Sequence, residues 1–250
     1  MSHDFRSRLL AGELLVGTMV TQGSAEIAEL LAGVGFDWLF VDGEHSPLAA
    51  ADVQRVLLGA GRDTPCLVRV AASEESAIKQ ALDSGAAGII VPMVNSAEQA
   101  AQVVRWAKYP PLGSRGVGVG RAHGYGMNLK GYLDTANDDI SVVIQAEHIK
   151  AVENIERIVE VQGIDAVFIG PYDLSASLGK IGELDHPQIL AAVDHVTQVC
   201  RQVNVALGCF GLTAEAVRPY MERGYTLITV GIETMILGFA AEELLARVRN

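Results

Sequence analysis

Short apolar runs rich in valine, isoleucine and leucine alternate with longer segments of helical periodicity along the whole chain. Eight of these runs are apolar on both faces, which is typical of parallel strands covered by helices. The predicted strands are Leu14–Val20, Phe36–Asp42, Cys66–Val70, Gly88–Val94, Ser141–Glu147, Ala166–Pro171, Ala206–Gly211 and Leu227–Ile232. Eight β–α units in 250 residues predict an α/β fold, a (β/α)8 barrel (TIM barrel) forming a single domain over residues 1–250. An open, doubly wound sheet is the alternative.

The segment 109–128, YPPLGSRGVGVGRAHGYGMN, is too long and too rich in glycine for an ordinary connection. Its glycines Gly116, Gly118 and Gly120 do not have the G-x-G-x-x-G spacing, and the P-loop lysine is missing. This excludes the common nucleotide-binding motifs. We interpret the segment as a flap over the open end of the barrel, with a solvated linker as the alternative.

Half of the residues are hydrophobic and 20% are charged, a composition that excludes intrinsic disorder. No apolar run approaches the roughly 18 residues of a membrane-spanning helix, so we expect no membrane partner. A net charge of −11 opposes binding of nucleic acid, which depends on lysine and arginine. The cysteines Cys66, Cys200 and Cys209 are odd in number and widely spaced, and the N-terminus lacks a signal-peptide pattern. We therefore expect a cytoplasmic protein without disulfide bonds.

Polar residues follow several of the predicted strands at the carboxyl end, where barrels of this kind carry their chemistry. They are Asp42, Glu44 and His45, then Arg69, then Gln145 and Glu147, and finally Tyr172 and Asp173. A structural role is the alternative for each, as a helix cap or an ion-pair partner, and for Asp42 we favour that role. For Glu147 and Asp173 we favour function, because a buried carboxylate is costly unless a cation neutralises it.

The residue types at these strand ends favour metal-assisted chemistry. Oxygen ligands without a nearby cysteine or paired histidine select a hard cation, Mg²⁺ or Mn²⁺. None of the five lysines falls inside the predicted barrel, so a Schiff-base mechanism lacks its nucleophile. A G-x-S-x-G motif is also missing. His45 is then the candidate general base.

Seven segments of the chain resemble, in the same order, those of a known family. They are FDWLFVDGEHSPL, LVRV, ALDSGAAGIIVPMV, YPPLGSRGVG, VIQAE, VFIGPYDLSASLG and VGIETMIL. The family is that of the HpcH/HpaI aldolases, the class II, metal-dependent pyruvate aldolases of the 4-hydroxy-2-oxo-heptane-1,7-dioate aldolase type. The resemblance covers nearly the whole chain and implies a (β/α)8 barrel that assembles as a homo-oligomer, a hexamer.

The resemblance also implies roles for individual residues. Glu147 and Asp173 would hold a divalent metal cation, Mg²⁺ or Mn²⁺ with Co²⁺ as a further candidate. Gln145, Tyr172 and Asp173 would contact the substrate, although Tyr172 stands where the family often has a small residue.

Three further residues would carry catalysis. Arg69 would stabilise an enolate, and His45 would be the base. By the same resemblance, Asp83 would support His45 from a neighbouring subunit. Within one chain the two should not meet, because Asp83 precedes the fourth predicted strand and so lies at the opposite end of its own barrel. A solvated carboxylate at a helix end is the alternative for Asp83.

The activity that this resemblance implies is reversible cleavage of a 4-hydroxy-2-oxo acid into pyruvate, or hydroxypyruvate, and an aldehyde. A citryl- or malyl-CoA-type lyase is the alternative within the same enolate chemistry. A non-catalytic 2-oxo acid sensor is the alternative of another class. The segment GVGRAHGYGMN differs from the arginine- and tryptophan-containing version of the family, so the sequence does not specify the aldehyde.

Overall fold

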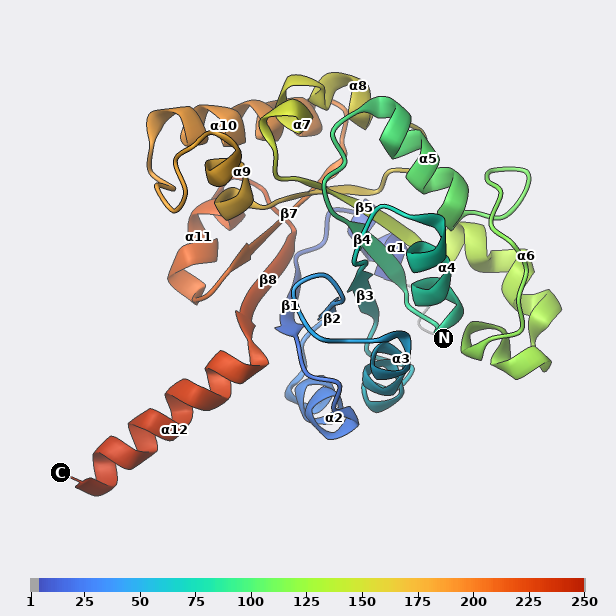
Figure 1. Ribbon diagram of the computed structural model, residues 1–250, viewed down its shortest axis with the longest axis horizontal. Helices are drawn as coiled ribbons and strands as arrows, with labels where there is room; N and C mark the ends of the chain where they lie inside the picture. Colours follow the sequence, from blue (N-terminus) through green and yellow to red (C-terminus); the bar gives the residue numbers. More distant parts are fainter. Residues whose placement is uncertain (1–4, 250) are drawn as a thin grey trace.

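Eight parallel β-strands close into a barrel in this computed structural model, which describes residues 5–249 (Figure 1). Each strand pairs with its neighbours in the sequence, and β1 also pairs with β8. The strands are β1 (Leu15–Val20), β2 (Trp38–Asp42), β3 (Cys66–Arg69), β4 (Gly88–Val91), β5 (Ser141–Ala146), β6 (Ala166–Ile169), β7 (Ala206–Gly211) and β8 (Leu227–Ile232). The closed order confirms the predicted (β/α)8 barrel and excludes the open sheet.

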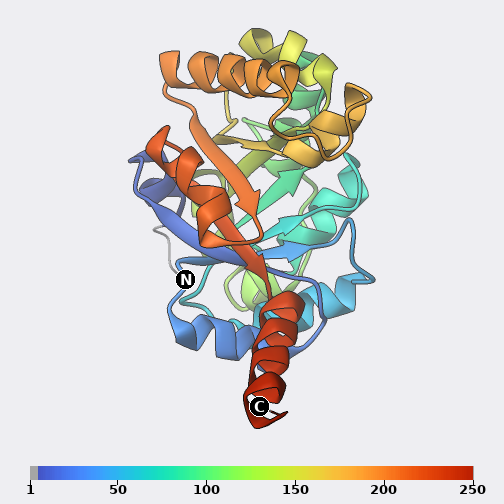
Figure 2. The ribbon, with the colours of Figure 1, turned by 90° about the vertical axis from the view of Figure 1, so that its left-hand side faces the viewer.

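Helices surround the barrel (Figure 2), and several of them begin at a capping side chain. The side-chain oxygens of Ser24, Ser96 and Thr213 accept hydrogen bonds from backbone amides in the first turns of α2, α5 and α11. The helices are α1 (Phe5–Leu10), α2 (Ala25–Val34), α3 (Ala50–Gly59), α4 (Glu75–Asp83), α5 (Ala97–Ala107), α6 (Leu129–Asp139), α7 (Ile149–Glu153), α8 (Ile155–Val159), α9 (Pro171–Ser177), α10 (Pro187–Gln202), α11 (Ala214–Glu222) and α12 (Glu233–Arg249), with a 3₁₀ helix, η1 (Arg121–Gly126).

A row of aromatic side chains fills the interior of the barrel. Phe5 of α1 lies 6.1 Å from Trp38, measured between ring centroids, and Trp38 lies 6.0 Å from Phe40. Phe40 in turn lies 5.7 Å from Phe168. The Cζ atom of Arg69 sits 5.3 Å from the centroid of the Phe40 ring. The apolar interior therefore extends directly to a charged side chain at the carboxyl end of β3.

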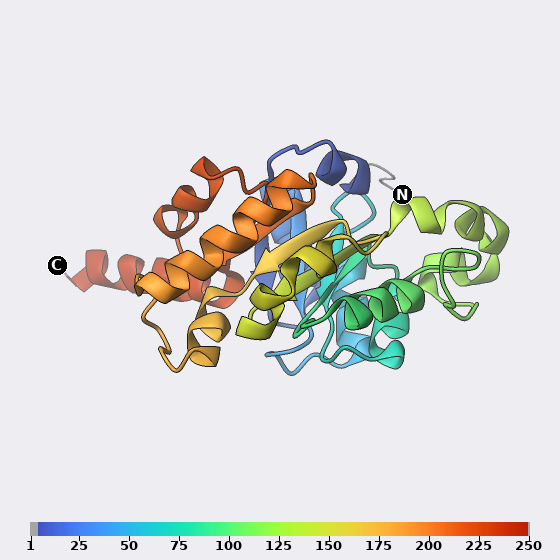
Figure 3. The same cartoon turned by 90° about the horizontal axis from the view of Figure 1, so that it is seen from above.

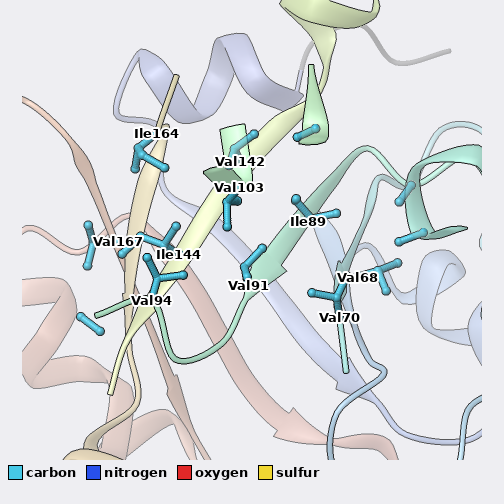
Figure 4. Close-up of a cluster of buried hydrophobic side chains, with 14 of the residues drawn as sticks. Val68, Val70, Ile89, Val91, Val94, Val103, Val142, Ile144, Ile164 and Val167 are labelled. Carbon is cyan, nitrogen blue, oxygen red and sulfur yellow. The ribbon is translucent and has the colours of Figure 1, made fainter. Parts of the chain in front are cut away.

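A second apolar layer joins the outer faces of the strands to the helices (Figure 4). Ile89 and Val91 of β4 and Val142 and Ile144 of β5 are fully buried there, together with Val103 of α5. Burial of one such side chain stabilises the fold by roughly 1.5–3 kcal/mol. This packing fixes where each strand ends, and so where the polar residues that follow it lie.

The segment 109–128 does not cover the carboxyl end of its own barrel, which corrects the interpretation as a flap there. Arg121 donates hydrogen bonds to the carbonyls of Ser84 (3.1 Å) and Leu57 (3.0 Å), at the ends of α4 and α3. These helix ends lie at the amino-terminal side of the barrel. His123 is fully buried, with Nε2 3.0 Å from the hydroxyl of Tyr109. The segment is packed against the fold at its buried residues, Arg115, Ala122 and His123, whereas Val119 and Met127 are exposed.

Helix α12 departs from the barrel after β8 (Figures 1 and 3). Its first residue, Glu233, is anchored, because Oε1 accepts hydrogen bonds from the Thr21 amide (2.7 Å), the Thr21 hydroxyl (2.8 Å) and the Gln22 amide (2.8 Å). Beyond this anchor the helix exposes large apolar side chains: Ile236, Leu237, Phe239, Leu244, Leu245 and Val248. No helix within residues 5–249 is both long and apolar enough to cross a membrane.

Candidate active site

Asp42 organises the loop that follows β2. Its Oδ1 atom accepts hydrogen bonds from the backbone amides of Glu44 (3.1 Å) and His45 (3.3 Å) and from Nε of Arg69 (2.8 Å). Burial alone would raise the pKa of Asp42, but the hydrogen bond and charge of Arg69 outweigh burial and lower that pKa below its ordinary value. Gly43 is required beside it, since a Cβ there would lie 2.7 Å from the Arg69 carbonyl oxygen.

Glu44 connects the buried arginine to the exposed histidine. Its Oε2 atom lies 3.2 Å from Nη1 of Arg69 and 3.7 Å from Nε2 of His45. The His45 side chain is 66% exposed, whereas that of Glu44 is 18% exposed. Burial raises the pKa of Glu44 above its ordinary value, and the positive charge of Arg69 opposes that rise. The sequence analysis named Glu44 only as a strand-end residue, so the structure adds it to the site.

Glu147 lies at the end of β5 and is held by two donors. The Met93 amide donates to Oε1 (2.8 Å), and Nε2 of Gln145 donates to Oε2 (2.9 Å). Met93 has a positive φ of 56°, a backbone conformation that costs energy outside glycine and directs its amide to this carboxylate. Gly170 leaves room for it, because a Cβ at that position would lie 2.9 Å from Glu147.

Negative charges crowd around Glu147. Burial and, to a smaller extent, the nearby carboxylates of Glu44 and Asp173 together raise the pKa of Glu147 to about 7, against the opposing hydrogen bond from Met93. Asp173 belongs to the first turn of α9, which follows β6 directly. Arg69 supplies positive charge to this group of carboxylates.

The carboxylates around Glu147 are suited to binding a hard divalent cation. The amide oxygen Oε1 of Gln145 is buried and has no hydrogen-bond partner within the described chain. Such an acceptor, beside two carboxylates, offers the oxygen ligands that Mg²⁺ and Mn²⁺ prefer. No group of three or more histidine, cysteine, aspartate or glutamate side chains within residues 5–249 has metal-binding geometry. Glu147 and the nearby Asp173 are carboxylates that could hold such a cation and leave positions for substrate and water.

The structure brings most of the predicted site residues to the same end of the barrel and places one elsewhere. His45, Arg69, Gln145, Glu147, Tyr172 and Asp173 all lie at or after the carboxyl ends of β2, β3, β5 and β6. Tyr172 is 56% exposed. Asp83 ends α4 at the amino-terminal side, where Oδ1 accepts a 2.6 Å hydrogen bond from Nη2 of the buried Arg115.

The sequence profile of a known family matches nearly all of this chain. The profile described as HpcH/HpaI aldolase/citrate lyase matches residues 16–238, which include all of the strand-end residues above. The chain belongs to the HpcH/HpaI aldolase/citrate lyase family.

Named members of the HpcH/HpaI family match this chain over almost their full length. It is 41% identical over 247 residues to a 4-hydroxy-2-oxovalerate aldolase of Rhodococcus jostii (strain RHA1), which covers 98% of this chain and 95% of that protein. It is 39% identical over 252 residues to a 4-hydroxy-2-oxo-heptane-1,7-dioate aldolase of Shigella sonnei (strain Ss046), with 99% and 95% covered.

A crystal structure of an HpcH/HpaI aldolase/citrate lyase family protein from Burkholderia cenocepacia J2315 superimposes with a TM-score of 0.95 at 38% identity, covering 100% of both chains. This HpcH/HpaI member is therefore an enzyme of the lyase class, an aldolase.

Proposed function

We propose that the enzyme reversibly cleaves a 4-hydroxy-2-oxo acid into pyruvate, or hydroxypyruvate, and an aldehyde. One observation carries the proposal: a buried arginine, two carboxylates and an unpartnered amide oxygen meet at the carboxyl end of one barrel. This arrangement suits a reaction in which negative charge develops on a carbonyl oxygen. The names of the two relatives, both aldolases of 4-hydroxy-2-oxo acids, support the same substrate class.

Glu147 and Asp173 would hold a divalent cation, Mg²⁺ or Mn²⁺ with Co²⁺ as a further candidate. When bound, such an ion would act as a Lewis acid toward the keto and carboxylate oxygens of the 2-oxo acid. Gln145 holds one oxygen of Glu147 through its amide nitrogen and presents its own oxygen to the same space. Tyr172, exposed next to Asp173, would border the substrate on the solvent side.

Arg69 is positioned to stabilise the enolate. Cleavage of C3–C4 transfers the bonding electrons to the C2 carbonyl, whose oxygen becomes negative, and protonation of C3 then gives pyruvate. Asp42 and Glu44 fix Nε and Nη1 of Arg69, while no described residue hydrogen-bonds to Nη2. That remaining donor group can therefore address the enolate oxygen from a fixed direction.

His45 would remove the proton from the C4 hydroxyl as the aldehyde forms. It is exposed at the open end of the barrel and contacts Glu44, which would stabilise the imidazolium produced by that proton transfer. In the assembled enzyme we propose that Asp83 of a second copy adds to this support.

The assembly we propose is a homo-oligomer, a hexamer as the family resemblance implies. The apolar side chains exposed along α12 favour contact with another copy, because so many large exposed apolar residues on one helix are unusual for a monomer. A cytoplasmic location is part of the proposal. Cys66, Cys200 and Cys209 are all free and buried, as expected in a reducing compartment.

Assays with matched substrates test the proposed activity. Purified enzyme with Mg²⁺ is given 4-hydroxy-2-oxopentanoate or malyl-CoA, and released pyruvate or glyoxylate is followed continuously. We expect pyruvate from the oxo acid, and neither glyoxylate nor acetyl-CoA from the thioester. The reverse result would favour the CoA-type lyase, and tight pyruvate binding without turnover would favour a sensor. A panel of aldehydes with pyruvate or hydroxypyruvate, read by product mass, then identifies the acceptor.

A further inference from the structure

A cavity of about 320 Å³ lies at the amino-terminal side of the barrel, away from the candidate active site. Residues from the end of α3, from the turn after α4, from the 3₁₀ helix η1 and from helix α6 line it. Cys66 at the start of β3 lines this cavity, whereas Arg69 at the end of β3 belongs to the active site. Its volume falls in the usual range for small-molecule sites.

Two arginines that line this cavity give it positive charge. Arg121 is half-buried, and its Nη1 and Nη2 atoms donate to the carbonyls of Ser84 and Leu57. Arg62 stands at the exposed rim. These carbonyls orient the Arg121 guanidinium without neutralising it. Burial lowers the pKa of Arg121, and the nearby charge of Arg62 lowers it further.

The two guanidinium groups have no counter-ion within residues 5–249. No carboxylate of the described chain forms an ion pair with Arg62 or Arg121. Asp139 is the acidic residue among those that line the cavity, and it belongs to α6. Two like charges close together are unfavourable unless an anion joins them. They are also unexpected in a chain whose net charge is −11.

The remaining wall is largely apolar. Leu57, Ala86 and Ile140 line it, and all three are buried. An anion that fits this wall therefore has an organic part as well as a charged group. We propose that the cavity is a second ligand site, which binds a small organic carboxylate or phosphate with its anionic group on Arg62 and Arg121 and its apolar part against Leu57.

Isothermal titration calorimetry with benzoate, phenyl phosphate and the neutral benzyl alcohol tests the proposal. The full-length protein is used in EDTA, so that the candidate active site holds no cation. We expect one molecule of benzoate or phenyl phosphate per chain and much weaker binding of benzyl alcohol. The tighter of the two anions identifies the natural ligand as a carboxylate or a phosphate.

Arg62→Gln and Arg121→Gln should each weaken anion binding about tenfold or more, the scale of one charge-assisted hydrogen bond. Arg157→Gln is the matched control, because Arg157 is an exposed arginine of α8 outside the cavity. Arg62 makes no hydrogen bond within the described chain, so its variant remains informative even where Arg121→Gln disturbs folding.

Two results would overturn the second site. They are equal binding of benzyl alcohol and anion binding that survives Arg62→Gln unchanged. Absence of binding by both anions at millimolar concentration would overturn it as well.

Discussion

Arg69 connects the apolar interior of the barrel to the polar residues at its carboxyl end. Its guanidinium packs against the ring of Phe40 and is held on two edges by the carboxylates of Asp42 and Glu44. Because these contacts hold the planar guanidinium of Arg69, its orientation toward the space beside Glu147 is fixed. Arginine is suited to that task because its donors form a rigid fork, whereas the ammonium of lysine is a single point.

Arg69→Lys should lower kcat for cleavage on the order of 10²-fold, because the positive charge remains but the fixed donor is lost. The affinity for Mg²⁺ or Mn²⁺ should change much less. Steady-state kinetics and metal titration check this, with Arg55→Lys, on the exposed face of α3, as the control. A kcat close to that of the wild type would reduce Arg69 to a structural ion-pair partner.

Glu44→Gln should lower cleavage roughly tenfold, the scale of one lost charge-assisted contact. The acidic limb of the pH profile of kcat/KM should move to lower pH, because a neutral amide stabilises the His45 imidazolium less than a carboxylate does. Decarboxylation of oxaloacetate forms the same enolate without removing a hydroxyl proton, so it should fall less than cleavage. Equal loss of both reactions, with an unmoved pH profile, would show that Glu44 only supports the fold.

The sequence predicted the residues whose position follows from strand direction alone. Arg69, Gln145 and Glu147 lie at the ends of apolar strands, and the parallel topology brings those ends together. The partnership of Glu44 with both Arg69 and His45 could not be predicted, since it depends on the turn that Asp42 holds. The D-G-E-H spacing was the available signal, because an aspartate before glycine commonly organises such a turn.

At the scale of elements, the strands were predictable because both of their faces are buried, but some of their ends were not. The fourth strand was expected to reach Val94 and ends at Val91, since Pro92 cannot continue the ladder and Met93 adopts a positive φ. The sixth was expected to reach Pro171, which instead begins α9. The predicted position of the segment 109–128 was wrong because its buried contacts are with the ends of α3 and α4, which are distant in the sequence.

Lys108, at the end of α5, supplies a prediction about stability. Its buried ammonium donates to the carbonyls of Asn137 (2.7 Å) and Ile140 (2.6 Å), and burial lowers its pKa to about 8 from 10.5. Between these pH values the unfolded chain binds a proton that the folded chain does not, so this group makes stability rise with pH. The full effect is on the order of 3 kcal/mol.

Lys108→Met removes this titration. Urea unfolding of both proteins below pH 8 and near pH 10 should show a free energy of unfolding that rises more with pH in the wild type than in the variant. Comparison of the two proteins cancels the other groups that titrate in this range. Parallel curves would mean that Lys108 keeps its proton in the folded chain over the whole range.

At the scale of the whole molecule, one chain does not bring all of the proposed catalytic residues together. Asp83 and His45 lie at opposite ends of the same barrel. Helix α12 extends away from that barrel (Figure 2) and exposes large apolar side chains. Both features are accounted for when a second copy supplies Asp83 to His45. Asp83 also neutralises the buried Arg115, so Asp83→Asn should lower thermal stability as well as activity.

Mixed oligomers separate these two effects of Asp83. Asp83→Asn and His45→Ala proteins, each expected to have low cleavage activity alone, are dissociated, mixed and reassembled. Some sites then contain an intact His45 with an intact Asp83 from the other variant, so part of the activity should return. Activity that fails to return in verified mixed oligomers, or a fully active monomer in analytical ultracentrifugation, would exclude the shared site.

The proposed cation-dependent cleavage at Glu147 and Asp173 is tested most directly by pyruvate release from 4-hydroxy-2-oxopentanoate before and after exhaustive treatment with EDTA. We expect the treatment to abolish release, Mg²⁺ or Mn²⁺ to restore it, and Glu147→Gln to remain inactive at the same metal concentration. Borohydride with pyruvate should leave the mass of the protein unchanged. Full activity after chelation, or the added mass of a reduced pyruvate imine on a lysine, would contradict the account.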